Sequence, residues 1–390
     1  MLRILYDPRA AGVLACVGLL LIGWSGLLVP SLIREIERDF VQTDAGLGVF
    51  YFINAVAYAG GSFGGGMLTE RFGRRRVMAL ATALLGLGLA AIGIVPIWVV
   101  VLLAAVPAGI GAGVIDGGVN GLVLDLYPDA RGRALNTLHL FFGVGALTSP
   151  LVVGGLVGAG VPWQAVLLGT AAVTVPIAAL WALIALPHGR RSRPASIVGA
   201  QAPGRLALRW PVIVLEIAIA CYVASEVGVS SWLIRFLDEV PLALATTSLS
   251  LYWAGLAVGR LVSARYSDRF DHLKYATLSV LLAGVATFAA VLVPSTGASI
   301  LLFALAGFAS GPVFPLIIAI GGERHPDRSA AVSGFLTSAA VVGGIIYPPI
   351  MGFLSVSIGL TAAMLGTAIL AGASAGALLL ARPRHGPNGR

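Results

Sequence analysis

Two acidic side chains lie near the middle of long apolar stretches, where an ionisable group is costly. Asp116 falls within the apolar stretch 97–125, and Glu226 falls within 210–237. An ionisable residue at membrane depth is by default a functional site. Burial favours the neutral form of a carboxylic acid, which suits a group that takes up and releases protons. We predict that both acids carry protons; an internal hydrogen bond that ties helices together is the structural alternative.

Polar and aromatic residues at similar depth are candidates for contacting a polar solute. Asn120 follows Asp116 by four residues and so shares its helix face, where it offers one donor and one acceptor. Aromatic rings stack on sugar faces, and their N–H and O–H groups form hydrogen bonds. Each residue also has a structural alternative. Any single ring can serve core packing or an interfacial belt, and His139 can be a histidine whose hydrogen bonds are satisfied within the protein. The Arg260 side chain can extend to the membrane interface. The predicted solute-binding residues are Asn120, Trp24, Tyr51, Asn54, His139, Tyr252, Trp253 and Arg260.

The composition places these residues in a membrane protein. Of 390 residues, 58% are hydrophobic and only 11% are charged, and the mean hydropathy is +0.95. A water-soluble domain carries about 25% charged residues. A span needs about 20 apolar residues and must be helical, because open strands would leave backbone groups unsatisfied in lipid. We predict an all-α integral membrane protein whose twelve transmembrane helices cover 11–33, 43–68, 74–94, 97–125, 132–159, 163–186, 210–237, 244–267, 274–293, 297–321, 329–357 and 360–381.

The charge pattern predicts the orientation of these helices. The net charge is +8, yet the basic residues fall in alternate loops and at the termini, so we interpret them as topology signals and not as a nucleic-acid surface. Only Arg34, Arg38 and Arg235 lie on the opposite side, and Arg260 lies within a span. By the positive-inside rule, the basic face and both termini are cytoplasmic. The first hydrophobic run is too long for a cleaved signal peptide, which favours a multi-pass plasma or bacterial inner-membrane protein.

A repeat divides the chain into halves. The sequence around Glu70-Arg71 returns 198 residues later at Asp268-Arg269, and the same offset pairs Gly109 with Gly307 and Gly113 with Gly311. A polar, basic stretch at 187–209 separates the halves. We predict a six-helix bundle at 1–186, a cytoplasmic linker at 187–209 and a second six-helix bundle at 210–390. Two pseudo-symmetric bundles can rock about a site at their interface, as in many secondary transporters.

These features together resemble the major facilitator superfamily. Its signature between helices 2 and 3 is similar to Gly66, Glu70-Arg71, Gly73 and Arg74-Arg75-Arg76, with a degenerate copy at Asp268-Arg269. The stretch 128–133 is similar to its loop between helices 4 and 5. A carboxylate here can face the positively charged N-terminus of a helix, and the arginines can pair with nearby acids, although topology alone accounts for some of them. The predicted cytoplasmic gate comprises Gly66, Glu70, Arg71, Gly73, Arg74, Asp129, Arg133, Asp268, Arg269 and Asp327.

A narrower resemblance is to the fucose-permease-like branch of sugar:proton symporters. It rests on the sequences 111–120, 133–136 and 142–150, and on Ser225-Glu226 with Trp232. The resemblance implies proton-coupled symport with an acid in helix 4, a role that falls on Asp116. Relatives commonly have a further acid in helix 1, which this chain lacks between Val13 and Ser31.

The function that we expect is proton-coupled symport of a small polar solute, a sugar, by alternating access. One alternative is proton-driven efflux of drugs or metabolites, since Gly145 to Pro150 partly matches the antiporter motif of helix 5. Another is a receptor or sensor on the same scaffold, which would need a signalling domain. We expect neither an enzyme nor a cofactor, because the sequence holds no nucleotide-binding Gly-Lys-Ser/Thr loop and no Cys/His metal cluster. The expected partners are the solute, protons and lipid, and the expected state is a monomer.

Overall fold

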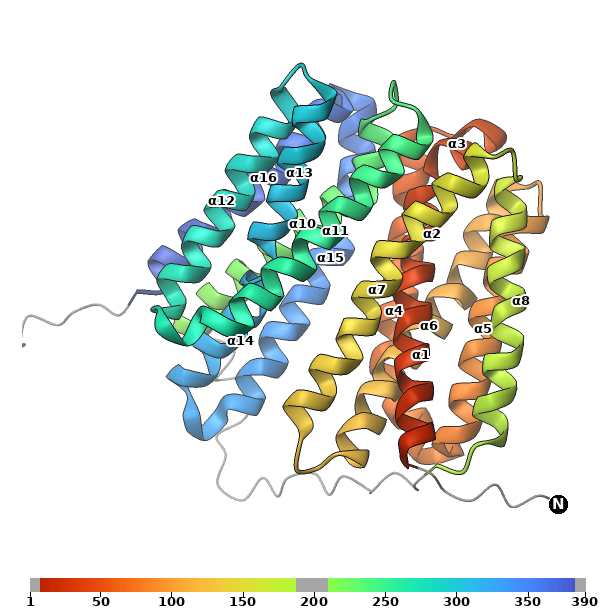
Figure 1. Cartoon of the computed structure of the whole chain (residues 1–390), viewed down its shortest axis with the longest axis horizontal. Coiled ribbons are helices and arrows are strands. Elements are labelled where there is room, and N and C mark those ends of the chain that lie inside the picture. The colour runs from red at the N-terminus through yellow and green to blue at the C-terminus, as the bar shows by residue number, and fades with distance from the viewer. Residues whose placement is uncertain (1–7, 187–209, 383–390) are drawn as a thin grey trace, which may run out of the picture. The chain divides into compact units, whose positions relative to one another are not determined.

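The computed structural model describes residues 8–186 and 210–382, and within this part of the chain every regular element is helical (Figure 1). Twelve helical segments are long and apolar enough to cross a membrane, which confirms the predicted all-α membrane fold. The elements are α1 (Pro8–Gly26), α2 (Leu28–Ser31), α3 (Ile33–Phe40), α4 (Asp44–Phe72), α5 (Arg74–Ile94), α6 (Trp98–Leu126), α7 (Arg131–Gly158), α8 (Trp163–Leu183), α10 (Trp210–Phe236), α11 (Leu242–Tyr266), η1 (Ser267–Arg269), α12 (His272–Leu292), α13 (Thr296–Ser310), α14 (Val313–Arg324), η2 (Pro326–Arg328), α15 (Ser329–Ile358) and α16 (Leu360–Leu380).

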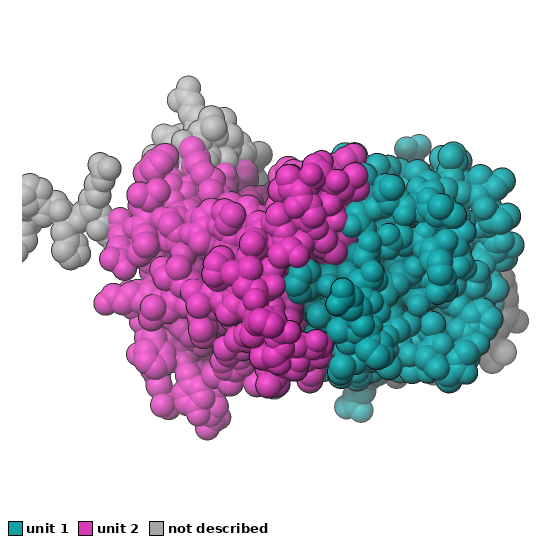
Figure 2. Space-filling model, turned by 90° about the horizontal axis from the view of Figure 1, so that it is seen from above, with its two compact units in different colours: residues 1–196, 233–250 teal, residues 197–232, 251–390 magenta. Residues whose placement is uncertain are grey.

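The chain forms two compact units, coloured teal and magenta in Figure 2. Unit 1 comprises Met1–Ser196 and Leu233–Ser250, and unit 2 comprises Ile197–Trp232 and Leu251–Arg390. The end of α10 and the start of α11 therefore pack with the first half of the chain. The predicted linker at 187–209 lies outside the described residues, and the boundaries predicted around it stay predictions.

Glycines set the spacing of neighbouring helices within each unit. In unit 1, a Cβ on Gly61 would collide with the carbonyl oxygen of Ile110, and a Cβ on Gly113 would collide with that of Tyr58. Helices α4 and α6 thus approach backbone to backbone, the close packing that small residues permit in membranes. The same contacts recur 198 residues later in unit 2: Gly259 meets the carbonyl of Phe308, and Gly311 meets that of Leu256. The sequence repeat is therefore also a repeat of helix crossings.

The structure differs from the predicted spans at two places. The first span does not run straight into a loop, because α2 and the short polar helix α3 follow it and end at Val41 in the left-handed conformation (φ 49°). The predicted span 297–321 is interrupted, since α13 ends at Ser310 and α14 begins at Val313. Pro312 lies between them and has no N–H to donate to the preceding turn.

The two copies of the loop signature turn by different means. In the first copy, Gly73 has φ +84°, a conformation that favours glycine. In the second copy, Asp271 occupies the corresponding position with φ −63°, and its carboxylate accepts a hydrogen bond of 2.8 Å from the Lys274 N–H. The aspartate therefore serves as an N-cap of α12 and replaces the glycine turn.

The glycine contacts yield a stability prediction with a matched neighbour. We expect Gly61→Ala to lower the unfolding temperature in detergent, because overpacking a filled site costs about 1–3 kcal/mol. Gly60→Ala is the control, since nothing lies within 4 Å of a Cβ at that position. Equal unfolding temperatures for the two variants would contradict the backbone-to-backbone contact between α4 and α6.

Candidate functional site

Asp116 lies at the centre of a hydrogen-bonded cluster in unit 1. Its Oδ2 atom accepts a bond of 2.8 Å from the Tyr58 hydroxyl on α4, and its Oδ1 atom accepts one of 3.0 Å from the Asn120 amide one turn further along α6. The Asn120 amide also donates to the Asp116 backbone oxygen at 2.9 Å. Both carboxylate oxygens therefore accept hydrogen bonds from neighbouring side chains.

The glycines of α6 bring this cluster together. Gly113 contacts the backbone of Tyr58, and Gly117 contacts the backbone of Ser62. Asp116 lies between these two contact points, so α4 is close enough for the Tyr58 hydroxyl to reach the carboxylate. Tyr58 was not among the predicted site residues. The spacing Gly113-x-x-x-Gly117 beside a tyrosine-bearing helix was the sequence signal that could have identified it.

The other predicted residues of unit 1 have diverse surroundings. His139 on α7 lies within electrostatic range of Asp116. The Asn54 amide donates to the Ala105 backbone oxygen at 3.1 Å, which ties α4 to α6. The Tyr51 ring packs edge-on against Phe50, with centroids 6.1 Å apart.

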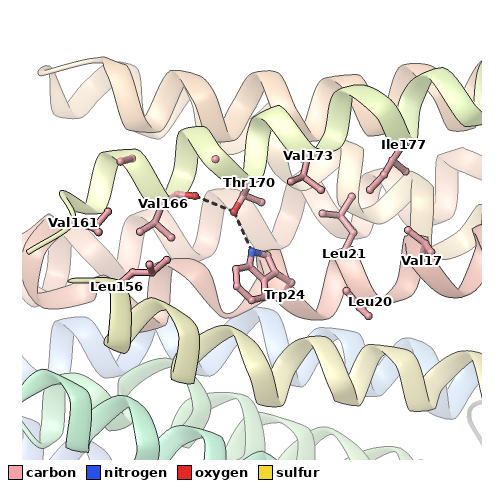
Figure 3. Close-up of a pocket in the computed structure, with 12 residues that line it drawn as sticks. Val17, Leu20, Leu21, Trp24, Leu156, Val161, Val166, Thr170, Val173 and Ile177 are labelled. Carbon is pink, nitrogen blue, oxygen red and sulfur yellow. Dashed lines mark hydrogen bonds between the residues drawn. The ribbon is translucent and has the colours of Figure 1, made fainter. Parts of the chain in front are cut away.

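Trp24 lines a separate apolar pocket in unit 1. The pocket has a volume of about 340 Å³ and lies among α1, α7 and α8. The Trp24 indole N–H donates to the Thr170 hydroxyl at 3.0 Å, and that hydroxyl donates to the Val166 backbone oxygen at 3.0 Å (Figure 3). The walls are otherwise aliphatic, with Leu21, Val173 and Ile177 among them. The indole N–H of Trp24 is thus already hydrogen-bonded within the protein.

A second buried acid, Glu226, lies in unit 2. It accepts a hydrogen bond from the Tyr222 hydroxyl one turn earlier on α10. The same hydroxyl lies 2.9 Å from the carbonyl oxygen of Ser310, the last residue of α13. The Tyr252 hydroxyl on α11 lies 3.5 Å from the Glu226 backbone oxygen. Tyr222 was not among the predicted residues, although its spacing of four from Glu226 was visible in the sequence.

Arg260 and Trp253 complete the polar interior of unit 2. The charge of Arg260 acts on Glu226. The Arg260 Nε atom is buried and has no hydrogen-bond partner among the described residues. The Trp253 indole N–H donates to the Ser230 hydroxyl at 2.9 Å. The structure therefore places Glu226, Tyr252 and Arg260 in one region of unit 2. The Arg260 Nε atom is a donor in this region that has no partner among the described residues.

The predicted gate residues divide into buried and exposed ones. Arg74 is buried and donates to the Asp125 carboxylate at 2.8 Å. Asp125 is a partner that the sequence analysis did not single out. In unit 2, the His272 ring lies 2.6 Å from Glu323 and 3.8 Å from Asp268, and the Arg269 guanidinium lies over the Tyr266 ring at 5.2 Å. The exposed gate residues are Gly66, Glu70, Arg71, Gly73, Asp129, Arg133, Asp268, Arg269 and Asp327.

Arg34 and Arg235, which the sequence analysis used only for topology, lie in a cluster of hydrogen-bonded charges in unit 1. Arg34 donates to the backbone oxygens of Ile234 and Val240 at 3.0 and 2.7 Å, and also to that of Leu237. These carbonyls lie in the last turn of α10 and in the turn that follows it, where a positive charge is favourable. Arg34 therefore caps α10 from α3.

Arg235 binds three carboxylates in the same cluster. Its guanidinium lies 2.7 Å from Glu37, 3.1 Å from Asp44 and 3.0 Å from Asp238. The Arg34 and Arg235 contacts together join α3 and the start of α4 to residues 233–250, which explains why that segment packs with unit 1. We name these five residues (Arg34, Glu37, Asp44, Arg235 and Asp238) the Arg34–Arg235 cluster.

Burial shifts the titration of the groups on α3. Desolvation raises the pKa of Glu37 above its ordinary value, against the opposing attraction of Arg235. Desolvation also raises the pKa of Glu35, whose Oε2 atom is buried without a hydrogen-bond partner among the described residues. The pKa of Arg34 is lowered by desolvation, which outweighs the attraction of Asp238. For Glu37 and Arg34, the cost of desolvation therefore exceeds the gain from their ion pairs.

The comparisons with known proteins identify the family. The model of the Major Facilitator Superfamily matches residues 13–337 and 214–390. The chain belongs to this superfamily. It is therefore a multi-pass membrane protein with a transporter fold, and the resemblance predicted from the loop signature is confirmed.

Individual relatives are more distant. The chain is 30% identical over 144 residues to a putative glucose/galactose transporter of Helicobacter pylori, a match that covers 36% of this chain and 34% of the relative. The matched part thus spans about a third of that relative's length.

Solved structures share the fold over nearly the whole chain. A bacterial homologue of the human lysosomal transporter Spinster has a TM-score of 0.78 at 18% identity and 96% coverage of both chains. A D-xylose-proton symporter has a TM-score of 0.75 at 16% identity, with coverage of 96% of this chain and 97% of that one. The fucose:proton symporter of E. coli has a TM-score of 0.63 at 19% identity, with coverage of 95% and 98%. At these identities the likeness shows the fold alone.

The cap on α10 can be tested by removing the guanidinium. We expect Arg34→Gln to lower the stability in detergent by about 1.5–3 kcal/mol, because buried carbonyls lose charge-assisted donors. Thermal unfolding measures the loss, and hydrogen exchange locates it at residues 233–240. Arg38→Gln on the same helix is the control, since the Arg38 side chain is 73% exposed. Similar behaviour of the two variants would show that Arg34 does not stabilise the end of α10.

Proposed function

We propose that this protein is a secondary transporter that moves a small polar solute, a sugar, together with protons by alternating access. The observation that carries the proposal is the Asp116 cluster: a carboxylate in the membrane-spanning helix α6, held at both oxygens by Tyr58 and Asn120. An ionisable group inside a membrane-spanning helix is energetically costly, and such residues commonly serve transport. The Glu226 cluster supplies a second acid in unit 2.

A coupling acid needs an ionised form that the protein stabilises and a neutral form that can cross low-dielectric surroundings. Tyr58 and Asn120 stabilise the carboxylate of Asp116, while its burial among α6 residues penalises the charge. Proton binding from water converts the carboxylate into a carboxyl group and removes that charge. The sugar-transporter names of the relatives and the polar groups of Asn120, Tyr252 and Arg260 support a hydroxylated solute.

The orientation and the gate belong to the same proposal. The basic face is cytoplasmic, with both termini on that side of a plasma or bacterial inner membrane. Glu70, Arg71, Asp268 and Arg269 are exposed at that face, where their ion pairs would form and break as the protein opens and closes. The working unit is a monomer.

The proposal is tested in proteoliposomes with D-glucose, D-galactose, D-xylose and L-fucose as probes. We expect a gradient of pH to drive accumulation of at least one of these sugars. Asp116→Asn is expected to abolish accumulation but to spare sugar exchange, because asparagine cannot cycle between charged and neutral forms. Asp271→Asn, at the exposed N-cap of α12, is the matched control, since asparagine caps a helix equally well.

Two results would overturn parts of the proposal. Absence of uptake for all four sugars, together with proton-driven efflux of a dye, would favour the antiporter alternative. Unchanged accumulation by Asp116→Asn would leave Glu226 as the coupling acid.

A further inference from the structure

The hydroxyl of Tyr222 lies near two hydrogen-bond acceptors but has only one proton to donate. It lies within hydrogen-bonding distance of the Glu226 carboxyl group and of the Ser310 carbonyl oxygen, the latter at 2.9 Å. A phenol carries one proton and donates one hydrogen bond. A carbonyl oxygen only accepts, and an ionised carboxylate only accepts. The protonation state of Glu226 therefore decides which bonds this group can form.

Counting donors gives two distinct arrangements. When Glu226 is ionised, Tyr222 donates to the carboxylate and the Ser310 carbonyl loses this donor. When Glu226 is neutral, its carboxyl O–H donates to the Tyr222 oxygen, and Tyr222 donates to Ser310. Only the neutral form supplies both of the bonds that the geometry provides. Asp116 differs, because among the described residues the Tyr58 hydroxyl has no second acceptor, and Asn120 is a further donor to the Asp116 carboxylate.

The groups that face Glu226 keep both forms accessible. Tyr222 is on the same helix, and Tyr252 and Arg260 face it from α11. Burial favours the neutral carboxyl, whereas the positive charge of Arg260 favours the carboxylate. Because these influences oppose each other, Glu226 is suited to change its protonation state during a cycle.

The Ser310 carbonyl is available to Tyr222 because the helix is broken there. Ser310 is the last residue of α13, and the last carbonyls of a helix lack intrahelical donors. Pro312 has no N–H to donate to the Phe308 carbonyl four residues earlier, and α14 begins at Val313. The Tyr222 hydroxyl thus supplies a donor at a helix end in the interior of unit 2, where Tyr222 is buried.

We propose that Tyr222 couples the protonation of Glu226 to the conformation of the break between α13 and α14. Proton uptake from water forms the neutral carboxyl group, which donates to Tyr222 and frees the phenolic proton for Ser310, so that the end of α13 is held. Proton release draws the Tyr222 hydroxyl back to the carboxylate and leaves the helix end free to rearrange. Tyr222 is a positioning residue, and its use in transport rests on the proposed function. The exchange of hydrogen bonds itself is measurable without a transported solute.

Hydrogen exchange of the purified full-length protein tests the coupling. The amides of Gly311, Val313, Phe314 and Leu316 are followed from acid to alkaline pH and corrected for intrinsic exchange rates. We expect protection in the unsubstituted protein to fall about fivefold as Glu226 ionises, the effect of losing one hydrogen bond. Glu226→Gln, which stays neutral, is expected to remove the dependence on pH. Tyr222→Phe is expected to remove it as well.

Tyr347→Phe is the matched control in the same unit. The Tyr347 hydroxyl donates to the Ala363 backbone oxygen at 2.9 Å, so this variant loses a comparable phenol–carbonyl bond away from Glu226. It is expected to keep the dependence on pH. Persistence of the fivefold change in Tyr222→Phe or Glu226→Gln, or its loss in Tyr347→Phe, would overturn the coupling.

An infrared titration gives a second readout that does not depend on the stability of Tyr222→Phe. We expect Glu226→Gln to remove one carbonyl stretch of a protonated, buried carboxyl group, and Asp116→Asn to leave that stretch in place. In folded Tyr222→Phe, the stretch is expected to shift to the higher frequency of a carboxyl group without an acceptor. Loss of the band in Asp116→Asn alone would assign the proton to the other acid and overturn the inference. Absence of sugar transport in proteoliposomes would refute the proposed function and leave these two measurements unaffected.

Discussion

The cost of an unsatisfied polar group in a membrane-spanning helix governs the interior of this protein. Lipid offers no hydrogen bonds, so every buried carboxylate must find donors in the protein or take up a proton. Asp116 meets this requirement with two donors, Tyr58 and Asn120. The Glu226 carboxyl group instead contacts the Tyr222 hydroxyl, which is also within reach of a backbone carbonyl. The same constraint thus produces one acid held by two donors and one whose phenol partner has a second acceptor.

The repeat explains how these two sites arise on one scaffold. The glycine contacts of Gly61 and Gly113 in unit 1 recur at Gly259 and Gly311 in unit 2, so the helix crossings are equivalent. The side chains at those crossings differ between the two units. Tyr58 corresponds to Leu256 at the offset of 198, so unit 2 lacks a phenol at that place. Backbone symmetry therefore preserves the fold, whereas its side-chain exceptions determine where charge can be held.

The sequence predicted the parts of this arrangement that follow from composition and periodicity. Twelve spans and the family followed from apolar runs and the loop signature, and Asp116 and Glu226 stood out because charge is rare in such runs. The bonds of Tyr58 and Tyr222 to the two acids were not predicted, because a tyrosine in an apolar helix is usually a packing residue. Only the approach of a neighbouring helix or turn gives its hydroxyl a role. The contacts of Arg34 with three carbonyls were also beyond prediction, because they depend on where α10 ends and α3 lies.

Pro312 distinguishes the interrupted helix of unit 2 from its counterpart in unit 1. At the offset of 198, Pro312 corresponds to Val114, and Val114 retains an N–H within the continuous helix α6. The equivalent helix of unit 2 is interrupted by Pro312, which leaves the Ser310 carbonyl at a helix end. Tyr222, the counterpart of Trp24, reaches that carbonyl, whereas Trp24 donates to a hydroxyl of α8. A tyrosine hydroxyl both accepts and donates, whereas an indole only donates. Among residues 8–186 and 210–382, it is therefore unit 2 that places a group able to accept and donate between a buried acid and an interrupted helix.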